Sequence, residues 1–104
     1  MSKLRAKPIP MVSIDAATLN PAAYIPINPG GLPEACYALR VLNYCDVSII
    51  LSYDGITEHD LLERGEPLYL FPLVDSVLAQ GTVFYVKGNV GIGRIYVTGF
   101  YSEE

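Results

Sequence analysis

The sequence is short of charge. Lysine, arginine, aspartate and glutamate make up 17% of its 104 residues, and 51% of the residues are hydrophobic, whereas soluble domains average about 25% charged residues. A chain of this length folds around one core. It has too little charge to cover a small globule completely, so we expect another molecule to cover part of its apolar surface.

Long apolar runs are also missing. No stretch approaches the roughly 18 to 20 residues of a membrane-spanning helix, and we expect no membrane association. Lys3, Arg5 and Lys7 supply the positive start of a signal peptide, but Pro8 and Pro10 interrupt the apolar segment that should follow. We therefore expect a protein made in the cytosol and left unprocessed.

Cysteine is scarce. Cys36 and Cys45 flank the segment YALRVLNY, which is typical of one strand about 30 Å long at roughly 3.3 Å per residue. Two cysteines at such a distance cannot form a disulfide. We predict two free, buried thiols that pack as small apolar side chains.

Histidine occurs once, at His59, in an acidic segment that also holds Asp54, Glu58, Asp60 and Glu63. Four carboxylates and an imidazole could hold a hard cation, but their spacing does not match an EF-hand loop. Nucleophilic catalysis needs a nucleophile, a base and an orienting group, and no Gly-x-Ser-x-Gly motif is present. We predict a solvated acidic turn, with no catalytic residue, no metal site and no cofactor.

The glycines Gly88, Gly91 and Gly93 precede an apolar, aromatic segment rather than a helix. A phosphate-binding loop needs the N–H groups of a helix N-terminus, so these glycines indicate a turn between strands. The aromatic strands on either side carry only Lys87 and Arg94 as cations. Because a nucleic-acid groove needs a basic lining, we expect nucleic-acid contact only through the basic N-terminal tip, if anywhere.

Proline is concentrated near the N-terminus, where six of the eight prolines precede residue 34. Each removes a backbone donor and favours extended conformations. We predict that residues 1–33 form an extended arm with a turn at residues 28–31. The arm is too apolar for a solvated linker, and we predict that it lies across a neighbouring subunit. Residues 34–104 form the predicted folded domain.

Short strand-like blocks separated by turns follow residue 34, which is typical of an all-β protein. We predict a small antiparallel β-sandwich or jelly-roll-like barrel. The expected strands are residues 36–44, 47–53, 67–73, 82–88 and 94–101, the last two forming a hairpin. We also expect a short helical turn around residues 59–64 and a loop or single turn at residues 75–80. Period-2 alternation predicts a core of Ile49, Leu51, Phe84, Val86, Ile95 and Val97.

Several sequence blocks, in order, resemble a known family. They are VSIILSYDG, the acidic ITEHDLLERGE, GTVFYVKG and RIYVTGFY. Their order is similar to that of small β-sandwich virion proteins of tailed bacteriophages, over roughly residues 38–101. The matching residues are Arg40, Asn43, Ser52, Asp54, Gly55, His59, Asp60, Gly65, Gly81, Thr82, Tyr85, Val86, Lys87, Gly88, Gly93, Ile95, Tyr96, Val97, Gly99 and Tyr101.

The resemblance implies a fold and a virion setting, but no site. It suggests a non-enzymatic structural subunit that decorates or joins the capsid or head-tail region. Its partners would then be the major capsid protein, the portal or other virion proteins, and its location the virion assembled in the host cytoplasm. Two alternatives stay open: a receptor- or carbohydrate-binding sandwich module of a phage fibre, and a metal-dependent enzyme on a small barrel.

Aromatic composition predicts association. The chain has 8 Tyr and 3 Phe with few lysines, and interfaces are enriched in aromatics and depleted in lysine. A sandwich also leaves edge strands that another subunit can pair with. We therefore expect a homo-oligomer or an obligate complex. Three aromatic residues of one strand cannot all face one small core, and the candidate interface residues are Lys3, Arg5, Lys7, Tyr24, Tyr96, Phe100 and Tyr101.

Overall fold

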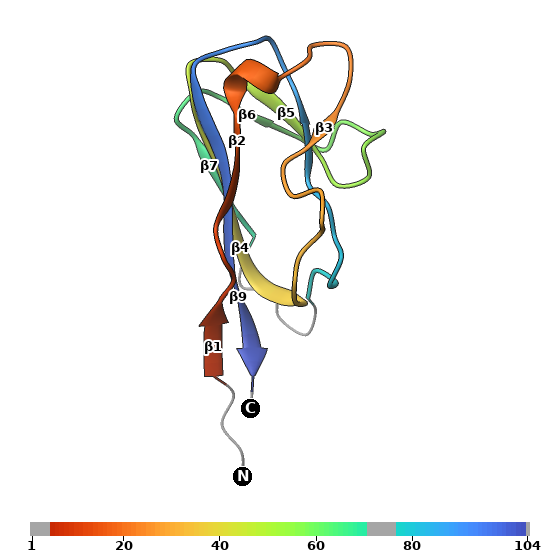
Figure 1. Ribbon diagram of the computed structural model, residues 1–104, viewed down its shortest axis with the longest axis vertical. Coiled ribbons are helices and arrows are strands. Elements are labelled where there is room, and N and C mark those ends of the chain that lie inside the picture. The colour runs from red at the N-terminus through yellow and green to blue at the C-terminus, as the bar shows by residue number, and fades with distance from the viewer. Residues whose placement is uncertain (1–4, 71–76, 104) are drawn as a thin grey trace.

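Two antiparallel sheets pack face to face in the computed structural model, which describes residues 5–70 and 77–103 (Figure 1). The predicted all-β sandwich is therefore confirmed. The strands are β1 (Arg5–Pro8), β2 (Val12–Asp15), β3 (Ile25–Pro26), β4 (Cys36–Cys45), β5 (Ile49–Ser52), β6 (Asp60–Leu62), β7 (Pro67–Leu70), β8 (Tyr85–Lys87) and β9 (Gly93–Glu103). One turn of 3-10 helix, η1 (Ala16–Thr18), follows β2.

The first sheet has the order β1-β9-β4-β7, and β2 pairs with the same edge of β9 further along that strand. The second sheet has the order β3-β8-β5-β6. Strands β4 and β9 are the longest, with 10 and 11 residues, and they pair with each other along most of their length. They form the central part of the first sheet, and β1 with the end of β9 extends toward the two chain termini (Figure 1).

All six residues of the predicted core are buried, each with at most 1% of its surface exposed. Ile95 and Val97 point inward from β9, and Ile49, Leu51 and Val86 meet them from the second sheet. The prediction succeeds because side chains two residues apart in a strand point to the same face. Figure 1 shows the space between the sheets that these side chains fill.

The N-terminal segment packs on its own sandwich. Strands β1 and β2 pair with β9, and β3 pairs with β8. Its buried hydrophobic side chains are Ile9, Ala16, Leu19, Ile27 and Leu32. We expected this segment to cross a neighbouring subunit, whereas its described part adds a strand or two to each sheet of the same chain.

The prolines of this segment suit the positions they occupy. Pro8 ends the edge strand β1, and Pro26 lies in the edge strand β3, where a missing backbone donor costs least. The predicted turn at residues 28–31 is confirmed, because the Gly31 N–H donates to the Asn28 carbonyl at 2.8 Å and Gly31 has φ 79°.

Two predicted elements are wrong. The last two blocks do not form a hairpin, because β8 pairs with β3 and β5 in the second sheet while β9 lies in the first. The glycine-rich connection between them passes from one sheet to the other. The expected helical turn at residues 59–64 is instead strand β6, which pairs with β5. Leu62 is buried and its neighbour Leu61 is exposed, which is the alternation of a strand.

Other boundaries shift by a few residues. Strands β5 and β8 are shorter than predicted, and β4 and β9 are slightly longer. Residues 71–73 of the expected third strand, and residues 75–76 of the loop after it, lie outside the described residues. Leu78, within that expected loop, forms an isolated antiparallel bridge with Cys36.

The two cysteines are free and buried, as predicted, at opposite ends of β4. Burial raises the pKa of the Cys36 thiol, and the negative charge of Glu34 adds to this effect. Cys36 therefore remains a protonated, weakly nucleophilic thiol at neutral pH. Within residues 5–70 and 77–103, no helix has the length and apolar character needed to cross a membrane.

Candidate functional site

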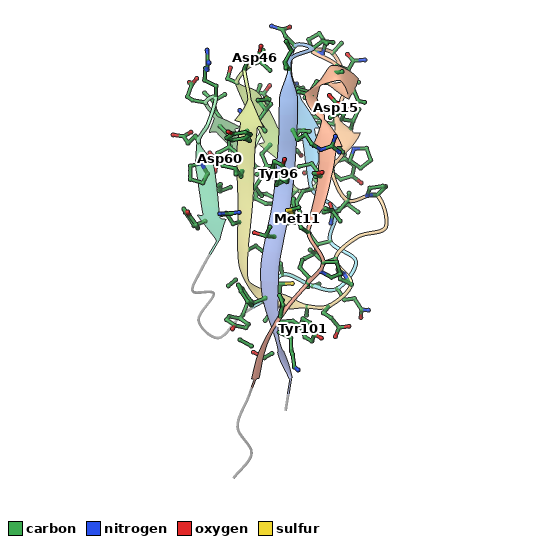
Figure 2. The ribbon with its side chains drawn as sticks, turned by 60° about the vertical axis from the view of Figure 1, so that its left-hand side comes forward. Met11, Asp15, Asp46, Asp60, Tyr96 and Tyr101 are labelled. Atoms are coloured by element: carbon green, nitrogen blue, oxygen red, sulfur yellow. The ribbon has the colours of Figure 1, made fainter. Side chains whose placement is uncertain are left out.

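The outer face of the first sheet, formed by the outward side chains of β4, β7 and β9, carries several exposed apolar side chains. Inward residues of β4 alternate with outward ones, and cross-strand pairing places Arg40 opposite both Thr98 and Tyr69. Figure 2 views the molecule with this sheet in front. Tyr96 lies on β9, and Met11 lies in the connection between β1 and β2. The outward residues are Ala38, Arg40, Leu42, Tyr44, Pro67, Tyr69, Arg94, Tyr96, Thr98 and Phe100.

Aromatic side chains of the outer face are well exposed. The exposed fractions are 66% for Tyr44, 53% for Tyr69 and 46% for Phe100. Monomeric proteins seldom gather large apolar side chains on one exposed surface unless that surface binds something. Because the opposite side of the sheet forms the core, these rings cannot turn inward. They therefore form an aromatic surface that faces away from the core.

A hollow of about 530 Å³ lies on this face between β1 and β7. Ala38 is a small outward residue in this part of the face, beside the larger Arg40 and Phe100. Gly99 occupies an inward position opposite Leu39, where a Cβ atom would lie 2.5 Å from Leu39 Cδ2 and 2.8 Å from the Ala38 carbonyl oxygen, so a larger residue would force its neighbours to shift. The lining residues are Pro8, Ile9, Ala38, Leu39, Arg40, Tyr69, Thr98, Gly99 and Phe100.

Arg40 is the one charged side chain among the lining residues, all of which the structure describes. It is half-buried among mostly apolar lining residues, which exclude part of the solvent. Electrostatic attraction is stronger there than in open water. Chemically, the hollow suits an apolar side chain that has a carboxylate nearby.

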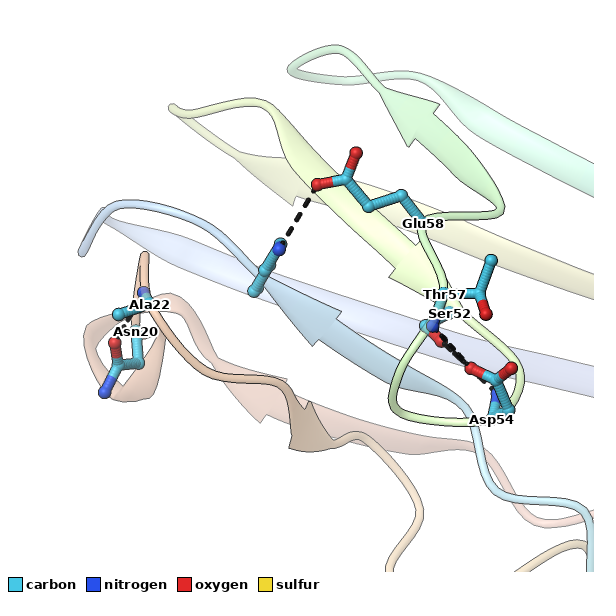
Figure 3. A network of polar contacts seen from close by, with 7 residues as sticks. Asn20, Ala22, Ser52, Asp54, Thr57 and Glu58 are labelled. Atoms are coloured by element: carbon cyan, nitrogen blue, oxygen red, sulfur yellow. Dashed lines mark hydrogen bonds and ion pairs between the residues drawn. The ribbon is translucent and has the colours of Figure 1, made fainter.

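The acidic segment does not gather its carboxylates around a common centre. Asp54 Oδ1 accepts the N–H groups of Ile56 and Thr57, both at 2.8 Å, and the Ser52 hydroxyl at 2.9 Å. Figure 3 shows the contact with Ser52 and the turn around it. The two backbone N–H groups, and then the Ser52 hydroxyl, hold the pKa of Asp54 well below its usual range. This carboxylate therefore shapes its own turn.

The neighbouring groups of the acidic segment are engaged elsewhere. Glu58 pairs with Lys87 at 3.2 Å (Figure 3). Nδ1 of His59 accepts the N–H of Tyr53 at 3.0 Å, and the two rings lie 5.1 Å apart. Among the described residues, no three His, Cys, Asp or Glu side chains converge on one point. The segment thus offers separate polar contacts.

A second, shallower hollow of about 450 Å³ lies at the end of the sandwich where β4 ends and β9 begins. Asp46 faces it, but its Oδ1 accepts the Ile92 N–H at 2.7 Å. A Cβ on Gly91 would lie 2.6 Å from the same oxygen. This carboxylate therefore holds two connections together and is not directed at a ligand.

The predicted interface residues are distributed over several surfaces. Tyr96 and Phe100 lie on the outer face, whereas Tyr101, on the same strand, packs against the core. The Tyr24 ring lies under the Lys87 ammonium, 4.7 Å from the ring centre, and its hydroxyl oxygen is buried. The structure therefore brings only two of the four aromatic candidates together.

The basic candidates lie near the chain start. Lys7 is half-exposed on β1, and the backbone of Arg5 pairs with Glu103, while Lys3 lies outside the described residues. Sequence reasoning missed Arg40, Tyr44 and Tyr69. The first two could have been found from the alternation of residues 36–45, because the inward positions Leu39 and Val41 place their neighbours on the opposite face.

No family model and no curated protein matches this sequence. Among solved structures, the chain is similar to a crystal structure of PirA, with a TM-score of 0.40 and 13% identical residues. The alignment covers 99% of this chain and 95% of PirA. No statement about function follows from similarity at this level.

Proposed function

We propose that this protein is a non-enzymatic structural subunit of a bacteriophage virion, which decorates or joins the capsid or head-tail region. It would act through protein–protein assembly, as a homo-oligomer in contact with the capsid, the portal or other virion proteins. The sequence blocks that resemble phage virion proteins suggest the setting. The outer face of the first sheet supports assembly as the activity.

The exposed aromatic side chains of the outer face are the observation on which this proposal depends. Tyr44, Tyr69 and Phe100 lie on the outward side of the first sheet, opposite the core, and each is about half exposed or more. Tyrosine and phenylalanine are enriched in protein interfaces because they bury a large area with few rotatable bonds. A subunit that assembles through this face would also account for the low charge of the sequence.

The composition of the hollow favours a protein partner over a carbohydrate. A sugar ring presents several hydroxyl groups that each need a hydrogen-bond partner when they are buried. Of the lining side chains, Arg40, Thr98 and Tyr69 are polar, and the rest are apolar. An apolar side chain of a protein partner would fit such a lining at a lower desolvation cost.

The proposal is tested in the strain that carries the gene. Particles released after induction are purified on a density gradient and analysed by quantitative mass spectrometry. We expect peptides of this chain to copurify with the major capsid protein at a fixed ratio that survives a second gradient. A chain that is expressed but stays in the soluble fraction, away from the particles, refutes the virion role.

A further inference from the structure

We propose that the hollow of the outer face binds the acidic segment, residues 54–63, of a second copy of this chain. Copies would then associate head to tail. This inference names the assembly contact within the proposed function and rests on that function for its biological setting. The contact itself is a property of the isolated protein.

The hollow offers apolar walls and one cation. Its lining combines the rings of Tyr69 and Phe100 with smaller apolar residues and the half-buried Arg40. An aliphatic side chain would fill the space between the rings, and a carboxylate beside it would pair with the guanidinium. The partner must therefore present an exposed aliphatic residue and an acidic residue close together.

The acidic segment of the same chain presents this combination. Ile56 is 83% exposed, more than any other large hydrophobic side chain in the described residues, and Leu61 is 53% exposed. Asp60 lies four residues after Ile56 in the same segment and is exposed, whereas the side chain of Leu61 points to the opposite face of β6. Four of the 11 Asp and Glu residues of the chain fall within residues 54–63, so the segment is strongly acidic.

Asp60 is the carboxylate best placed to pair with an outside cation. Glu58 is paired with Lys87, and Asp54 accepts hydrogen bonds within its own turn. Asp60 accepts only a backbone N–H, that of Leu61 at 2.9 Å, and forms no ion pair with the side chains that the structure describes. Asp60 is exposed on the edge strand β6. Burial raises the pKa of the nearby Tyr53, and the negative charge of Asp60 adds to this effect.

The two surfaces lie on different sheets. The hollow is on the first sheet, and the acidic segment follows β5 in the second sheet, on the side of the molecule away from β9 (Figure 1). When the hollow of one copy binds the acidic segment of another, the pair still has a free acidic segment at one end and a free hollow at the other. Such heterologous contacts close into rings or continue as filaments.

The area of the outer face is sufficient for a stable contact. Strand β9 has 11 residues, which extend about 36 Å, and four strands side by side span about 19 Å. The face therefore covers roughly 700 Å², close to the roughly 800 Å² per partner of standard interfaces.

Charge reversal tests the pairing. Arg40→Glu and Asp60→Arg are each purified as full-length chains, and their folding is checked by circular dichroism. Association is followed by sedimentation velocity across a hundredfold dilution series. We expect each variant alone to need about tenfold or more protein to associate, because it brings like charges together. An equimolar mixture should regain wild-type association, since each variant then supplies the charge that the other lacks.

A matched pair of apolar variants tests the second part of the contact. Ile56→Ser should weaken association by about tenfold, because it removes the side chain that fills the hollow. Ile92→Ser changes an equally exposed isoleucine outside the segment, 79% exposed, and should leave association unchanged. If Arg40→Glu fails to fold, Arg40→Gln is used in its place. We expect Arg40→Gln alone to show the same loss of association.

Several outcomes would overturn the inference. A wild-type chain that stays monomeric at every concentration excludes the contact, as does an Arg40→Glu variant that associates normally. Single variants that fail and do not rescue each other show that Asp60 is not the partner of Arg40. The proposed function fails separately: a chain that self-associates but is absent from particles loses its virion role, and a particle-bound monomer loses only this contact.

Discussion

Asn43 connects the two sheets through its buried side chain. It projects inward from β4, and its Nδ2 lies within hydrogen-bond distance of the carbonyls of Val47 (2.9 Å), Leu62 (3.1 Å) and Glu63 (3.1 Å). Its Oδ1 accepts the Cys45 S–H at 2.7 Å. Two amide hydrogens are thus shared among three acceptors, and one of these belongs to β6 in the second sheet.

We predict that Asn43→Ala destabilises the fold by about 3 to 5 kcal/mol. Asn43 has no exposed surface, so water does not reach the carbonyls that lose their donors. Each buried polar group left without a partner costs about 1 to 3 kcal/mol, and the cavity adds to this cost. The loss is large for a small domain, whose total stability is about 5 to 15 kcal/mol.

Urea unfolding followed by circular dichroism measures the effect. Asn89→Ala serves as the control, because Asn89 is exposed in a connection and should change stability by less than about 0.5 kcal/mol. Asn43→Leu separates the two causes, since it restores volume without the hydrogen bonds. We expect it to remain strongly destabilised. A leucine variant as stable as the wild type would refute the hydrogen-bond explanation and leave only the cavity.

Four further predictions concern the core, the backbone and the chain start. Leu51→Ala removes a side chain with no exposed surface and should lower the free energy of unfolding by about 2 to 5 kcal/mol in the same urea assay. Gly93→Ala should lower the melting temperature by several degrees, because Gly93 has φ 118° and an added Cβ would clash with a backbone carbonyl. A Cβ atom on Gly30 would meet open space, so Gly30→Ala should change the melting temperature little. Deleting residues 1–33 should abolish folding, as judged by circular dichroism, because five buried hydrophobic residues are lost. The lowered pKa of Asp54 means that its contribution to stability is present above its unfolded-state pKa and is lost as pH falls below that value. Between pH 5 and about pH 2.5, the free energy of unfolding should therefore fall less for Asp54→Asn than for the wild type. An equal fall in the two proteins would show that the ionised Asp54 does not stabilise its turn.

The core could be predicted because its signal is local. Alternation within a strand depends only on the direction of successive side chains, and it placed Ile49 and Leu51 together on the inward side. The same rule would have identified Leu62 as inward and Leu61 as outward. Two adjacent leucines after charged residues instead suggested a helical turn, since so short a segment fits either period.

The pairing of strands could not be predicted in the same way. A glycine-rich connection of about five residues can turn a chain back on itself or carry it from one sheet to another. The choice depends on which edges other strands have already taken: β5 and β3 pair with β8, and β4 pairs with β9. These partners are distant in sequence. The hairpin prediction failed for this reason.

The position of the N-terminal segment depends on the same kind of contact. Its apolar residues correctly indicated that it lies against a surface. Whether that surface belongs to the same chain depends on the free edge of β9, which exists only once β4 and β9 have paired. The candidate interface was limited in the same way: Tyr96 and Phe100 were identified by counting aromatics, and the register of β4 and β7 was needed to add Arg40 and Tyr69.

The arrangement of edges indicates how a partner can bind. Strand β9 carries three of the predicted interface residues, but β4 lies on one side of it and β1 and β2 lie on the other. The edge strands are β1, β2 and β7 in the first sheet and β3 and β6 in the second, each with two to four residues, and short edge strands resist pairing with other chains. Association through added strands is therefore disfavoured. A partner must instead use the side chains of the outer face, where specificity depends on the fit of the hollow and on Arg40.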